Sequence, residues 1–397
     1  MKITTVVSTS ILLMAITACN KQTPSETPAK SEKPAAVTIG GEPVVTLEVT
    51  KPTDPNVFAF TSAQVLPGRG MNTFQIRAQV PGKGEVNVLD APSPEEAARV
   101  MNGGPEDMIG NKSFSVGGAL LVPYANRITG KLSADGKTIE TTILGKTITL
   151  PANWGGKKPG ARKYAMHGLI LDAKMQDVKE ESAAGESSVS ATLHAGDFGG
   201  HWPSKTDLRT KVTLRNNAFE LQVTATNVGN EPLPMGIGWH PYFSLPSGDR
   251  RQARLHLPAL KRAPANNYDE VLPTGQIVPV AGTEFDFSAP GGRALGSLFL
   301  DDNFVDIQKT PDGNTVSEVI DPAAKYGIRI TATSKEVNAI QVYAPPEKSF
   351  VVLEPQFNLA DPFSKVWKGK VNTGMVVLQP GQSVTYTTRL ELFAPEK

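Results

Sequence analysis

The chain has 397 residues, of which 39% are hydrophobic and 20% charged, with 40 Lys and Arg against 39 Asp and Glu. This length supports a sizeable core. The near balance of charge, with no charged block in the body of the chain, argues against nucleic acid as a partner, because phosphate binding requires a concentrated basic surface. The 36 Gly and 32 Pro favour a protein of many short strands and turns.

The N-terminal residues 1–19 have the pattern of an export signal. Lys2 precedes an apolar run, from Val6 to Ile16, that is too short to span a bilayer. Small residues then lead to Cys19, the only cysteine in the chain. The segment resembles a bacterial lipoprotein signal, in which the cysteine is lipidated and becomes the new N-terminus. The alternative is an ordinary secretory signal with an incidental cysteine.

The lipoprotein interpretation predicts a membrane anchor at Cys19 and no other membrane contact. Asn20 follows instead of an aspartate, so the resemblance to Gram-negative lipoproteins implies the periplasmic face of a membrane, with the outer membrane favoured. Residues 20–40 are rich in Pro, Ser, Thr, Lys and Glu and predict a flexible tether, because they cannot bury enough apolar surface to offset the entropy of ordering. Residues 41–397 are predicted to form one domain.

The body of the chain carries one helical signal and many strand signals. Residues 94–100 predict a short helix with Ser93 as N-cap and Glu96 completing a capping box. The polar stretch 176–190 is interpreted as an exposed excursion between strands. Residues 210–228 alternate apolar and polar side chains around an Asn-Asn turn, which predicts a β-hairpin with one buried face.

Further strands are predicted toward the C-terminus. They are expected at residues 328–332, 339–343, 350–353, 375–378 and 384–392, and turn pairs such as Pro-Gly and Asp-Gly separate many of the apolar segments. The pattern predicts an all-β fold, a large antiparallel β-sandwich with one core and no boundary after the tether.

The chemistry suggested by the residues is acid/base chemistry without a metal. The chain has no phosphate-binding glycine loop, paired-cysteine metal site or nucleophile elbow, and with five His and one Cys a zinc site would use nearly all of them. Four segments combine polar groups with strand or turn contexts: residues 123–130, 164–169, 236–243 and 351–356.

His240 is the first candidate. Pro241 cannot donate to a strand ladder, so His240 is predicted to lie at a strand end or on an edge strand, where its ring can face a cleft. Trp239 and Tyr242 add flat apolar area that suits the C–H face of a sugar ring. The alternative is a histidine satisfied by a backbone carbonyl beside a core aromatic cluster.

Glu354 is the second candidate. It ends an apolar run that begins at Phe350, and a buried carboxylate is costly unless it is paired or functional. Desolvation should raise its pKa toward the range of a general base. The alternative is a structural salt bridge, for which Arg127 is the suggested partner. Arg127 with Asn126 is interpreted either as a holder of sugar hydroxyls or as a surface arginine on an edge strand.

Taken in order, these segments resemble the aldose 1-epimerase (galactose mutarotase) family over about residues 45–393. The motifs that carry the resemblance are Asn126–Lys131, His167–Gly168, Asn227–Gly229, His240–Phe243, Asp301–Phe304 and Leu353–Gln356. His-Pro-Tyr-Phe and Leu-Glu-Pro-Gln are the most specific of them. The resemblance implies a galactose mutarotase-like supersandwich, in agreement with the alternating pattern.

The resemblance also implies an isomerase that interconverts the anomers of a free aldose without a cofactor or metal. The implied catalytic residues are Glu354 as general base and His240 as general acid, and the implied substrate-binding residues are His167, Arg127, Asp301 and Asn126. Residues 91–112 follow the family loosely, and neither the sugar nor the oligomeric state is predicted. Two other classes stay open: a non-catalytic carbohydrate-binding lipoprotein, and a sugar-cleaving enzyme with Asp301 as its second carboxylate.

Overall fold

The computed structural model describes Met1 and residues 37–107, 109–369 and 371–396. Two large sheets dominate these residues, and neighbouring strands within both are antiparallel. This architecture confirms the predicted all-β class and the large antiparallel β-sandwich.

The larger sheet has eleven strands in the order β22-β21-β24-β27-β28-β19-β7-β5-β4-β3, with β6 also paired to β5. In that order the strands span Val278–Pro279, Ala259–Ala263, Leu300–Ile307, Ala339–Ala344, Phe350–Gln356, Gly238–Ser244, Gly118–Leu121, Asn72–Val80, Ala59–Leu66 and Val45–Glu48, and β6 spans Gly84–Asn87. Strands distant in sequence, such as β7, β19 and β28, therefore lie side by side.

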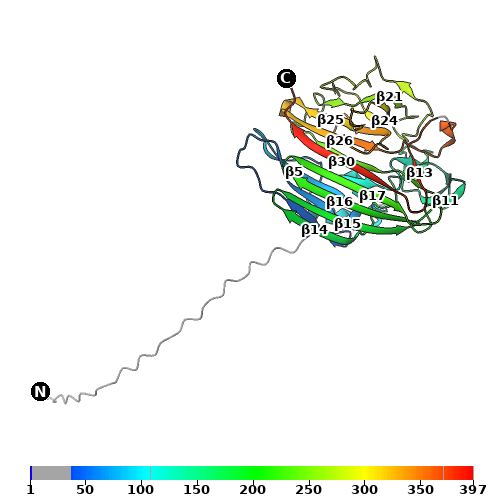
Figure 1. Ribbon diagram of the computed structural model, residues 1–397, viewed down its shortest axis with the longest axis horizontal. Helices are drawn as coiled ribbons and strands as arrows, with labels where there is room; N and C mark the ends of the chain where they lie inside the picture. The colour runs from blue at the N-terminus through cyan, green and yellow to red at the C-terminus, as the bar shows by residue number, and fades with distance from the viewer. Residues whose placement is uncertain (2–36, 108, 370, 397) are drawn as a thin grey trace. The chain divides into compact units, whose positions relative to one another are not determined.

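The second sheet has nine strands in the order β14-β15-β16-β17-β30-β26-β25-β20-β23. In that order they span Gln176–Ala183, Glu186–Gly196, Thr206–Arg215, Ala218–Asn227, Ser383–Phe393, Tyr326–Ala332, Thr315–Asp321, Arg254–His256 and Arg293–Ala294. Figure 1 shows β14 to β17, β30, β26 and β25 running next to one another across the domain.

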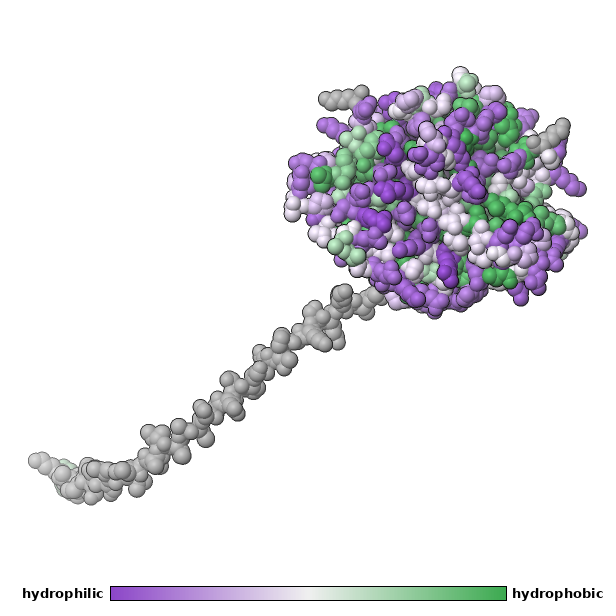
Figure 2. Space-filling view, viewed as in Figure 1, coloured by the Kyte–Doolittle hydropathy of each residue, from purple (hydrophilic) through white to green (hydrophobic). Residues whose placement is uncertain are grey.

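One hydrophobic cluster fills the space between the two sheets. It combines side chains of the nine-stranded sheet, such as Val212 and Leu221, with side chains of the eleven-stranded sheet, such as Ile340 and Leu353. Apolar burial of this kind contributes roughly 25 cal/mol per Å² and is the main stabilising term. On the face shown in Figure 2, hydrophilic side chains are interspersed with smaller hydrophobic areas, as expected when the core lies between the sheets.

Trp239 anchors β19 in this core. Its indole is fully buried, and its Nε1 donates a hydrogen bond of 3.0 Å to the carbonyl oxygen of Gly118. Gly118 has to lack a side chain, because a Cβ there would lie 2.5 Å from Nε1 of Trp239. Since side chains alternate along a strand, the inward placement of Trp239 and Phe243 turns His240 and Tyr242 to the opposite face.

Smaller elements flank the two sheets. They are β1 (Thr38–Ile39) with β2 (Glu42–Pro43), β11 (Lys146–Pro151) with β10 (Thr138–Ile143) and β9 (Lys131–Leu132), β12 (Trp154–Gly155) with β13 (Lys163–Met166) and β8 (Arg127–Ile128), and β18 (Leu233–Met235) with β29 (Val376–Leu378). Short 3₁₀ turns span Pro67–Arg69, Pro105–Asp107, Asn111–Ser115, Pro322–Ala324 and Lys365–Trp367.

The predicted helix and hairpin are confirmed. Helix α1 spans Pro94–Val100, and its N-terminus carries the expected capping box: the Ser93 hydroxyl accepts from the Glu96 N–H, and the Glu96 carboxylate accepts from the Ser93 N–H. Strands β16 and β17 form the predicted hairpin around residues 216–217.

Two local predictions were wrong. Residues 176–190 are not an excursion but form β14 and part of β15, and β14 lacks apolar periodicity because it is an almost fully exposed edge strand. Pro241 does not place His240 at an edge, because β19 lies inside the sheet between β28 and β7. The pairing of β19 with β28 holds at Gly238 and is next found at Tyr242, so the proline occupies an interruption of that ladder.

The start of the fold lies just inside the range predicted as tether, residues 20–40. Strand β1 begins at Thr38, and Ile39 is buried against Leu66 and Phe74. The predicted signal peptide with Cys19, and nearly all of the tether, lie outside the described residues. Among the residues that are described, no helix combines the length and the apolar character needed to cross a bilayer.

Candidate active site

A cavity of about 460 Å³ brings all the predicted sugar-site residues together. Its lining comes from β19, β24, β27 and β28 of the eleven-stranded sheet, from the small sheet β12-β13-β8, and from nearby loops. The predicted residues that line it are Asn126, Arg127, His167, His240, Asp301 and Glu354. Their convergence is the main structural finding about the site, and their individual roles stay predictions.

Glu354 and His240 face each other from neighbouring strands. Gly238 pairs with Gln356, and Tyr242 pairs with Val352, so the register places His240 opposite Glu354 at the interruption of the ladder. The Oε1 atom of Glu354 lies 3.6 Å from Nε2 of His240. Both side chains are buried, with 0% and 5% of each residue exposed. The predicted carboxylate and imidazole therefore form one buried pair.

His167 completes a cluster of unsatisfied polar groups. Its ring centroid lies 4.9 Å from that of His240. Both ring nitrogens of His167, Nδ1 of His240 and both carboxylate oxygens of Glu354 have no hydrogen-bond partner within the described part of the chain. An unpaired buried polar group costs ~1–3 kcal/mol, and such groups are rare. Because all three residues line the cavity, a ligand with several hydroxyl groups can satisfy them.

The backbone at His167 is held in an unusual conformation. His167 has φ of 61°, and Gly168 has φ of 82°. A Cβ at Gly168 would lie 2.2 Å from the carbonyl oxygen of Val122, so only glycine fits there. The amide of His167 donates a 2.8 Å hydrogen bond to the carbonyl of Asn126. Strain of this kind is typical of functional sites, and here it fixes where the His167 ring enters the cavity.

Burial shifts the pKa values of the pair in opposite directions. Desolvation raises the pKa of Glu354 well above its ordinary value; nearby Asp301 raises it further, and Arg127 opposes the shift. Desolvation lowers the pKa of His240 to about 3, a backbone hydrogen bond opposes that shift, and Arg127 lowers the pKa further. The Glu354 carboxylate is therefore a stronger base, and the His240 imidazolium a stronger acid, than the same groups in water.

Arg127 is buried and is held by two neighbouring side chains. It starts β8, pairs in register with Met166 of β13, and is 4% exposed, which rules out a surface arginine. Its Nη1 donates to Oδ1 of Asn126 at 2.6 Å, and its Nη2 donates to Oδ2 of Asp301 at 3.3 Å. The ion pair of Arg127 is thus made with Asp301, and the suggested salt bridge to Glu354 is absent from the described contacts.

Gln341 ties this group together. It lies on β27 directly across from Glu354 in register. Its Nε2 donates to Oδ1 of Asp301 at 2.6 Å, and its Oε1 accepts from Nδ2 of Asn126 at 3.1 Å and also from the side-chain amide of Asn303. Both oxygens of Asp301 are therefore held, one by Gln341 and the other by Arg127.

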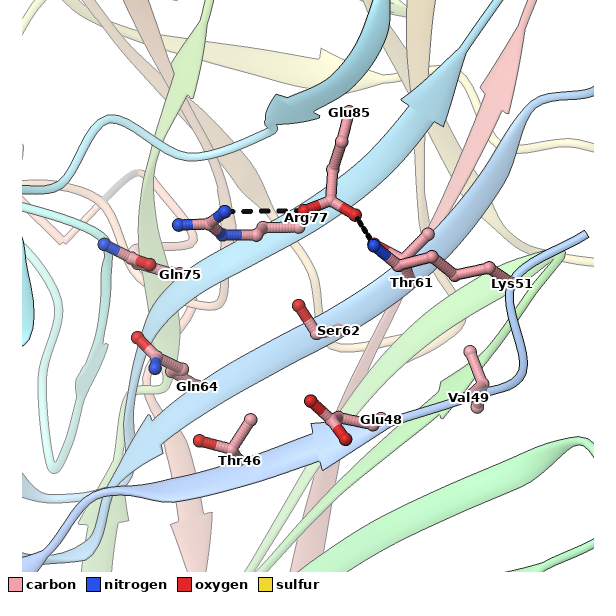
Figure 3. Close-up of a pocket in the computed structure, with 10 residues that line it drawn as sticks. All are labelled: Thr46, Glu48, Val49, Lys51, Thr61, Ser62, Gln64, Gln75, Arg77 and Glu85. Carbon is pink, nitrogen blue, oxygen red and sulfur yellow. Dashed lines mark hydrogen bonds and ion pairs between the residues drawn. The ribbon is translucent and has the colours of Figure 1, made fainter. Parts of the chain in front are cut away.

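A second hollow of about 450 Å³ lies over β3, β4 and β5, on side chains drawn in Figure 3. There Glu85 accepts from both Lys51, at 2.5 Å, and Arg77, at 3.4 Å. The residues lining it include no aromatic ring and no histidine, and its basic groups already have an acidic partner. We therefore place the candidate chemistry in the first cavity.

The remaining histidines lie outside the cavity. His194 contacts Asp207, and the rings of His201 and His256 contact backbone carbonyls. No group of three or more His, Cys, Asp or Glu side chains suited to a metal ion occurs within residues 37–107, 109–369 and 371–396. The residues that could act on a ligand here are the acid/base pair and its polar neighbours.

Sequence reasoning missed several cavity residues. They are Gln341 and the aromatic side chains Phe114, Trp154, Tyr268, Phe299 and Tyr343. Gln341 is the one polar residue within the apolar strand predicted at 339–343, which is a signal that could have marked it. Phe114, Tyr268 and Phe299 come from loops and turns without a periodic pattern, so no comparable signal exists for them.

Comparisons with known proteins agree with the family resemblance of the sequence motifs. The family model described as aldose 1-epimerase matches residues 84–391. A galactose mutarotase-like protein from Clostridium acetobutylicum is 19% identical, with a TM-score of 0.66, and the match covers 85% of this chain and 93% of that one.

Two further solved structures share the fold. One is an aldose epimerase homologue from C. elegans, with 17% identity, a TM-score of 0.64 and coverage of 89% of this chain and 100% of that one. The other is a galactose 1-epimerase from Lactobacillus acidophilus, with 16% identity, a TM-score of 0.60 and the same coverages. At these identities the structural likeness establishes the fold, while the family model covers most of the chain.

Proposed function

Because this chain belongs to the aldose 1-epimerase family, we propose that it interconverts the α and β anomers of a free aldose by acid/base ring opening and reclosure. The observation that carries the proposal is the buried pair of Glu354 and His240, with Nε2 and Oε1 3.6 Å apart. The hydroxyl oxygen and the ring oxygen of an anomeric centre are bonded to the same carbon. Groups that exchange protons with both oxygens therefore have to lie within a few ångströms of each other.

In the proposed reaction Glu354 takes the proton of the anomeric hydroxyl while His240 gives a proton to the ring oxygen. The bond between the anomeric carbon and the ring oxygen breaks, which leaves an aldehyde and a free hydroxyl. Rotation about the adjacent C–C bond presents the other face of the aldehyde. Reclosure returns each proton to the group that supplied it, so the site is regenerated. Each positioned acid or base typically contributes ~10²–10⁴-fold.

The pKa shifts favour this direction of proton transfer. Ring opening starts with an ionised Glu354 and a protonated His240. It ends with a protonated Glu354 and a neutral His240. Burial raises the pKa of Glu354 and lowers that of His240, so it favours the neutral pair. From the ionised pair, which these shifts make the minor form of the one-proton state, proton transfer in the direction of ring opening is therefore favourable, and the pair holds one proton throughout.

The neighbouring groups would hold the sugar. His167 has two unpaired ring nitrogens beside His240, and we place it near the ring oxygen. Arg127 and Asp301 fix each other and line the cavity, where they can bind the other hydroxyl groups, with Asn126 behind them. This fixed arrangement suits a rigid, hydroxyl-rich ring.

Two observations weigh against the other functions. A pure binding site has no need of a buried acid/base pair with opposed pKa shifts. A sugar-cleaving enzyme usually requires two carboxylates that act on the bond. Asp301, the candidate for the second carboxylate of such an enzyme, is already bound at both oxygens by Gln341 and Arg127, so it is better placed to position the substrate.

The site of action is also part of the proposal. We propose that the protein is exported and held by a lipid at Cys19 on the periplasmic face of a bacterial membrane, with the outer membrane favoured, because the short apolar run and the small residues after it lead to that cysteine. There it would meet sugars before their uptake. We propose no nucleic-acid partner, since acidic and basic residues are balanced.

The direct test is the mutarotation of freshly dissolved α-glucose and α-galactose, followed by polarimetry or one-dimensional NMR. The expected result is an approach to the same anomeric equilibrium at a rate proportional to the protein concentration. An unchanged rate for every aldose tested, with protein that is folded by circular dichroism, would refute the proposed function.

A further inference from the structure

Phe114 covers the two cavity histidines from a turn outside the large sheets. Its ring centroid lies 4.8 Å from that of His167, with the rings edge to face at 60°, and 6.0 Å from that of His240. The imidazole centroids are 4.9 Å apart, so the three rings form a compact triangle. Phe114 lines the cavity and is only 4% exposed. One side of the acid/base site is therefore made of hydrocarbon.

The turn that carries Phe114, Asn111–Ser115, is fastened to the rest of the fold. The Ser113 hydroxyl donates a 2.6 Å hydrogen bond to the carbonyl oxygen of Leu171, and the carbonyl oxygen of Ser113 accepts one of 2.5 Å from the side-chain amide of Asn72. Asn72 is itself fully buried at the start of β5. Because buried hydrogen bonds hold the residue before it, the ring of Phe114 has a fixed place beside the histidines.

Asn153 joins this turn to the strand that leads to His167. Its Nδ2 donates to Oδ1 of Asn111 at 2.8 Å, and its carbonyl oxygen accepts a 2.5 Å bond from Nδ2 of Asn111. The same side-chain amide binds both backbone groups of Met166, accepting from its N–H at 2.8 Å and donating to its carbonyl oxygen at 3.1 Å. Met166 ends β13 and directly precedes His167. One side chain thus sets the spacing between the turn of Phe114 and His167.

Phe114 brings neither a charge nor a hydrogen-bonding group to the histidines. Lys112, the charged residue of its turn, does not line the cavity. The titratable groups around the two imidazoles come from other elements: Arg127 on β8, Tyr242 on β19, Asp301 on β24 and Glu354 on β28. What the phenyl ring contributes is the exclusion of water, and desolvation is the largest cause that lowers the pKa of both His167 and His240.

Removal of this ring would open a place for water beside the imidazoles. A water molecule takes up ~30 Å³ in the liquid, less than the volume of a phenyl ring. Polar partners for it are at hand, because both ring nitrogens of His167 and Nδ1 of His240 are unpaired within the described residues. Water there would stabilise the charged imidazole, so the His240 imidazolium would become a weaker acid.

We propose that Phe114 is a positioning residue of anomer exchange, whose ring keeps water away from His167 and His240 and holds the two imidazoles in place for the sugar. This inference rests on the proposed function and adds to it a residue that acts through the histidines. The turn 111–115 and Asn153 keep the ring at its fixed distance from them.

Proton NMR of the histidine rings tests the exclusion of water without any substrate. The chain has five histidines, and the three that lie outside the cavity are internal controls. In wild type the signals of His167 and His240, assigned with His167→Asn and His240→Asn, should stay constant between about pH 8 and about pH 5, because burial lowers the pKa of both. In Phe114→Ala at least one of them should titrate within that range, closer to the ordinary pKa of ~6.5, while the three controls titrate as in wild type.

Anomer exchange of glucose gives the second readout. Phe114→Ala should lower kcat by ~10–10²-fold with a smaller change in KM, and the rising limb of kcat/KM should move to higher pH as the pKa of His240 rises. Phe114→Leu keeps much of the apolar volume and should stay close to wild type in both readouts, and Phe114→Val should lie between Leu and Ala. If Phe114→Ala does not fold, the order of wild type, Leu and Val carries the same test.

Leu272→Ala is the matched structural control. Leu272 is 2% exposed and packs in the same small hydrophobic cluster as Phe114, but it does not line the cavity. Its truncation should lower the midpoint of urea denaturation, because it leaves a cavity in the cluster. The histidine titration and kcat should stay as in wild type.

The two readouts separate this inference from the proposed function. Ordinary titration of His167 and His240 in wild type would overturn the inference, and so would Phe114 variants, folded by circular dichroism, in which only one readout or neither responds. A fall in kcat with unchanged titration would show a merely structural role. In each of these cases exchange of anomers by wild type leaves the proposed function standing. The expected titrations in a protein that exchanges no sugar would support the exclusion of water by Phe114 and refute the proposed function.

Discussion

Removal of the Gln341 side chain should damage both stability and substrate binding. In Gln341→Leu the amides of Asn126 and Asn303 each lose an acceptor in the interior, and Oδ1 of Asp301 loses its donor. An unpaired buried group costs ~1–3 kcal/mol. Asp301 is partly exposed to the cavity, where water can replace the lost donor, whereas Asn126 and Asn303 are only 0% and 4% exposed. Counting only the two asparagines, we expect a loss of ~2–6 kcal/mol in the free energy of unfolding.

Gln341→Glu separates the two effects. The glutamate keeps an acceptor for both asparagine amides. Its other carboxyl oxygen, however, takes the place of Nε2, 2.6 Å from Oδ1 of Asp301, so two carboxyl groups then face each other. The loss of stability should be smaller than for Gln341→Leu. Because Asp301 is then displaced or protonated, KM for the sugar should rise roughly tenfold, with less effect on kcat.

Urea denaturation and the kinetics of anomer exchange give the two readouts for Gln341. Gln222→Leu, at an exposed position of β17, is the control and should match wild type in both. Wild-type stability and wild-type KM in both Gln341 variants would show that the network does not position the substrate.

Four further outcomes are expected. Because the pair works with one proton, kcat/KM should rise with pH through the lower pKa of the pair, near 3 for His240, and should fall only through the raised pKa of Glu354. A narrow pH optimum between ~4.3 and ~6.5, the ordinary pKa values of Glu and His, would contradict these pKa shifts. Gly168→Ala should lower the free energy of unfolding by at least ~2 kcal/mol in urea denaturation, since its φ is 82° and its Cβ would clash with the chain. Cys19→Ser should release the protein from the membrane fraction without loss of activity, and continued fractionation with membranes would refute the anchor. EDTA should leave exchange intact, because the proposed chemistry uses side chains alone; a loss restored by a divalent cation would refute the mechanism.

Local patterns predicted the local structure. The capping box at Ser93 and the alternation in residues 210–228 both act within a few residues, so the helix and the hairpin could be predicted from the sequence. The prediction for residues 176–183 was wrong for a related reason: an edge strand exposed on both faces has no apolar periodicity that would reveal it. Its strand character depends on pairing with β15, which composition does not reveal.

The site depends on contacts between distant segments. Arg127 and Asp301 are 174 positions apart, and Asn126 and Gln341 are 215 apart, so no local pattern joins them. From the residues alone, His240, Glu354 and Arg127 each kept an ordinary structural alternative, and the ordered set of motifs was needed to group the candidates. Gln341 and the aromatic cavity residues Phe114, Trp154, Tyr268, Phe299 and Tyr343 belong to no such motif. Their place follows from the register of β24, β27 and β28 and from loops that the large sheet brings together.

The same limit explains the error at Pro241. A proline inside a strand usually marks an edge, because it cannot donate to a neighbour. Here β19 is an inner strand, and its pairing with β28 is interrupted between Gly238 and Tyr242. The interruption coincides with the position of His240 opposite Glu354. The interruption of the pairing with β28, which accommodates the proline, cannot be predicted from the sequence.

The central claim, that Glu354 and His240 act as one acid/base pair, is tested most directly by anomer exchange in Glu354→Gln, His240→Asn and the double variant. His256→Asn, at a ring outside the cavity, is the control. We expect each single substitution to lower kcat by at least ~10²-fold with a smaller change in KM, and the double variant to be far less impaired than the product of the two. A folded Glu354→Gln protein that retains most of its activity would contradict the claim.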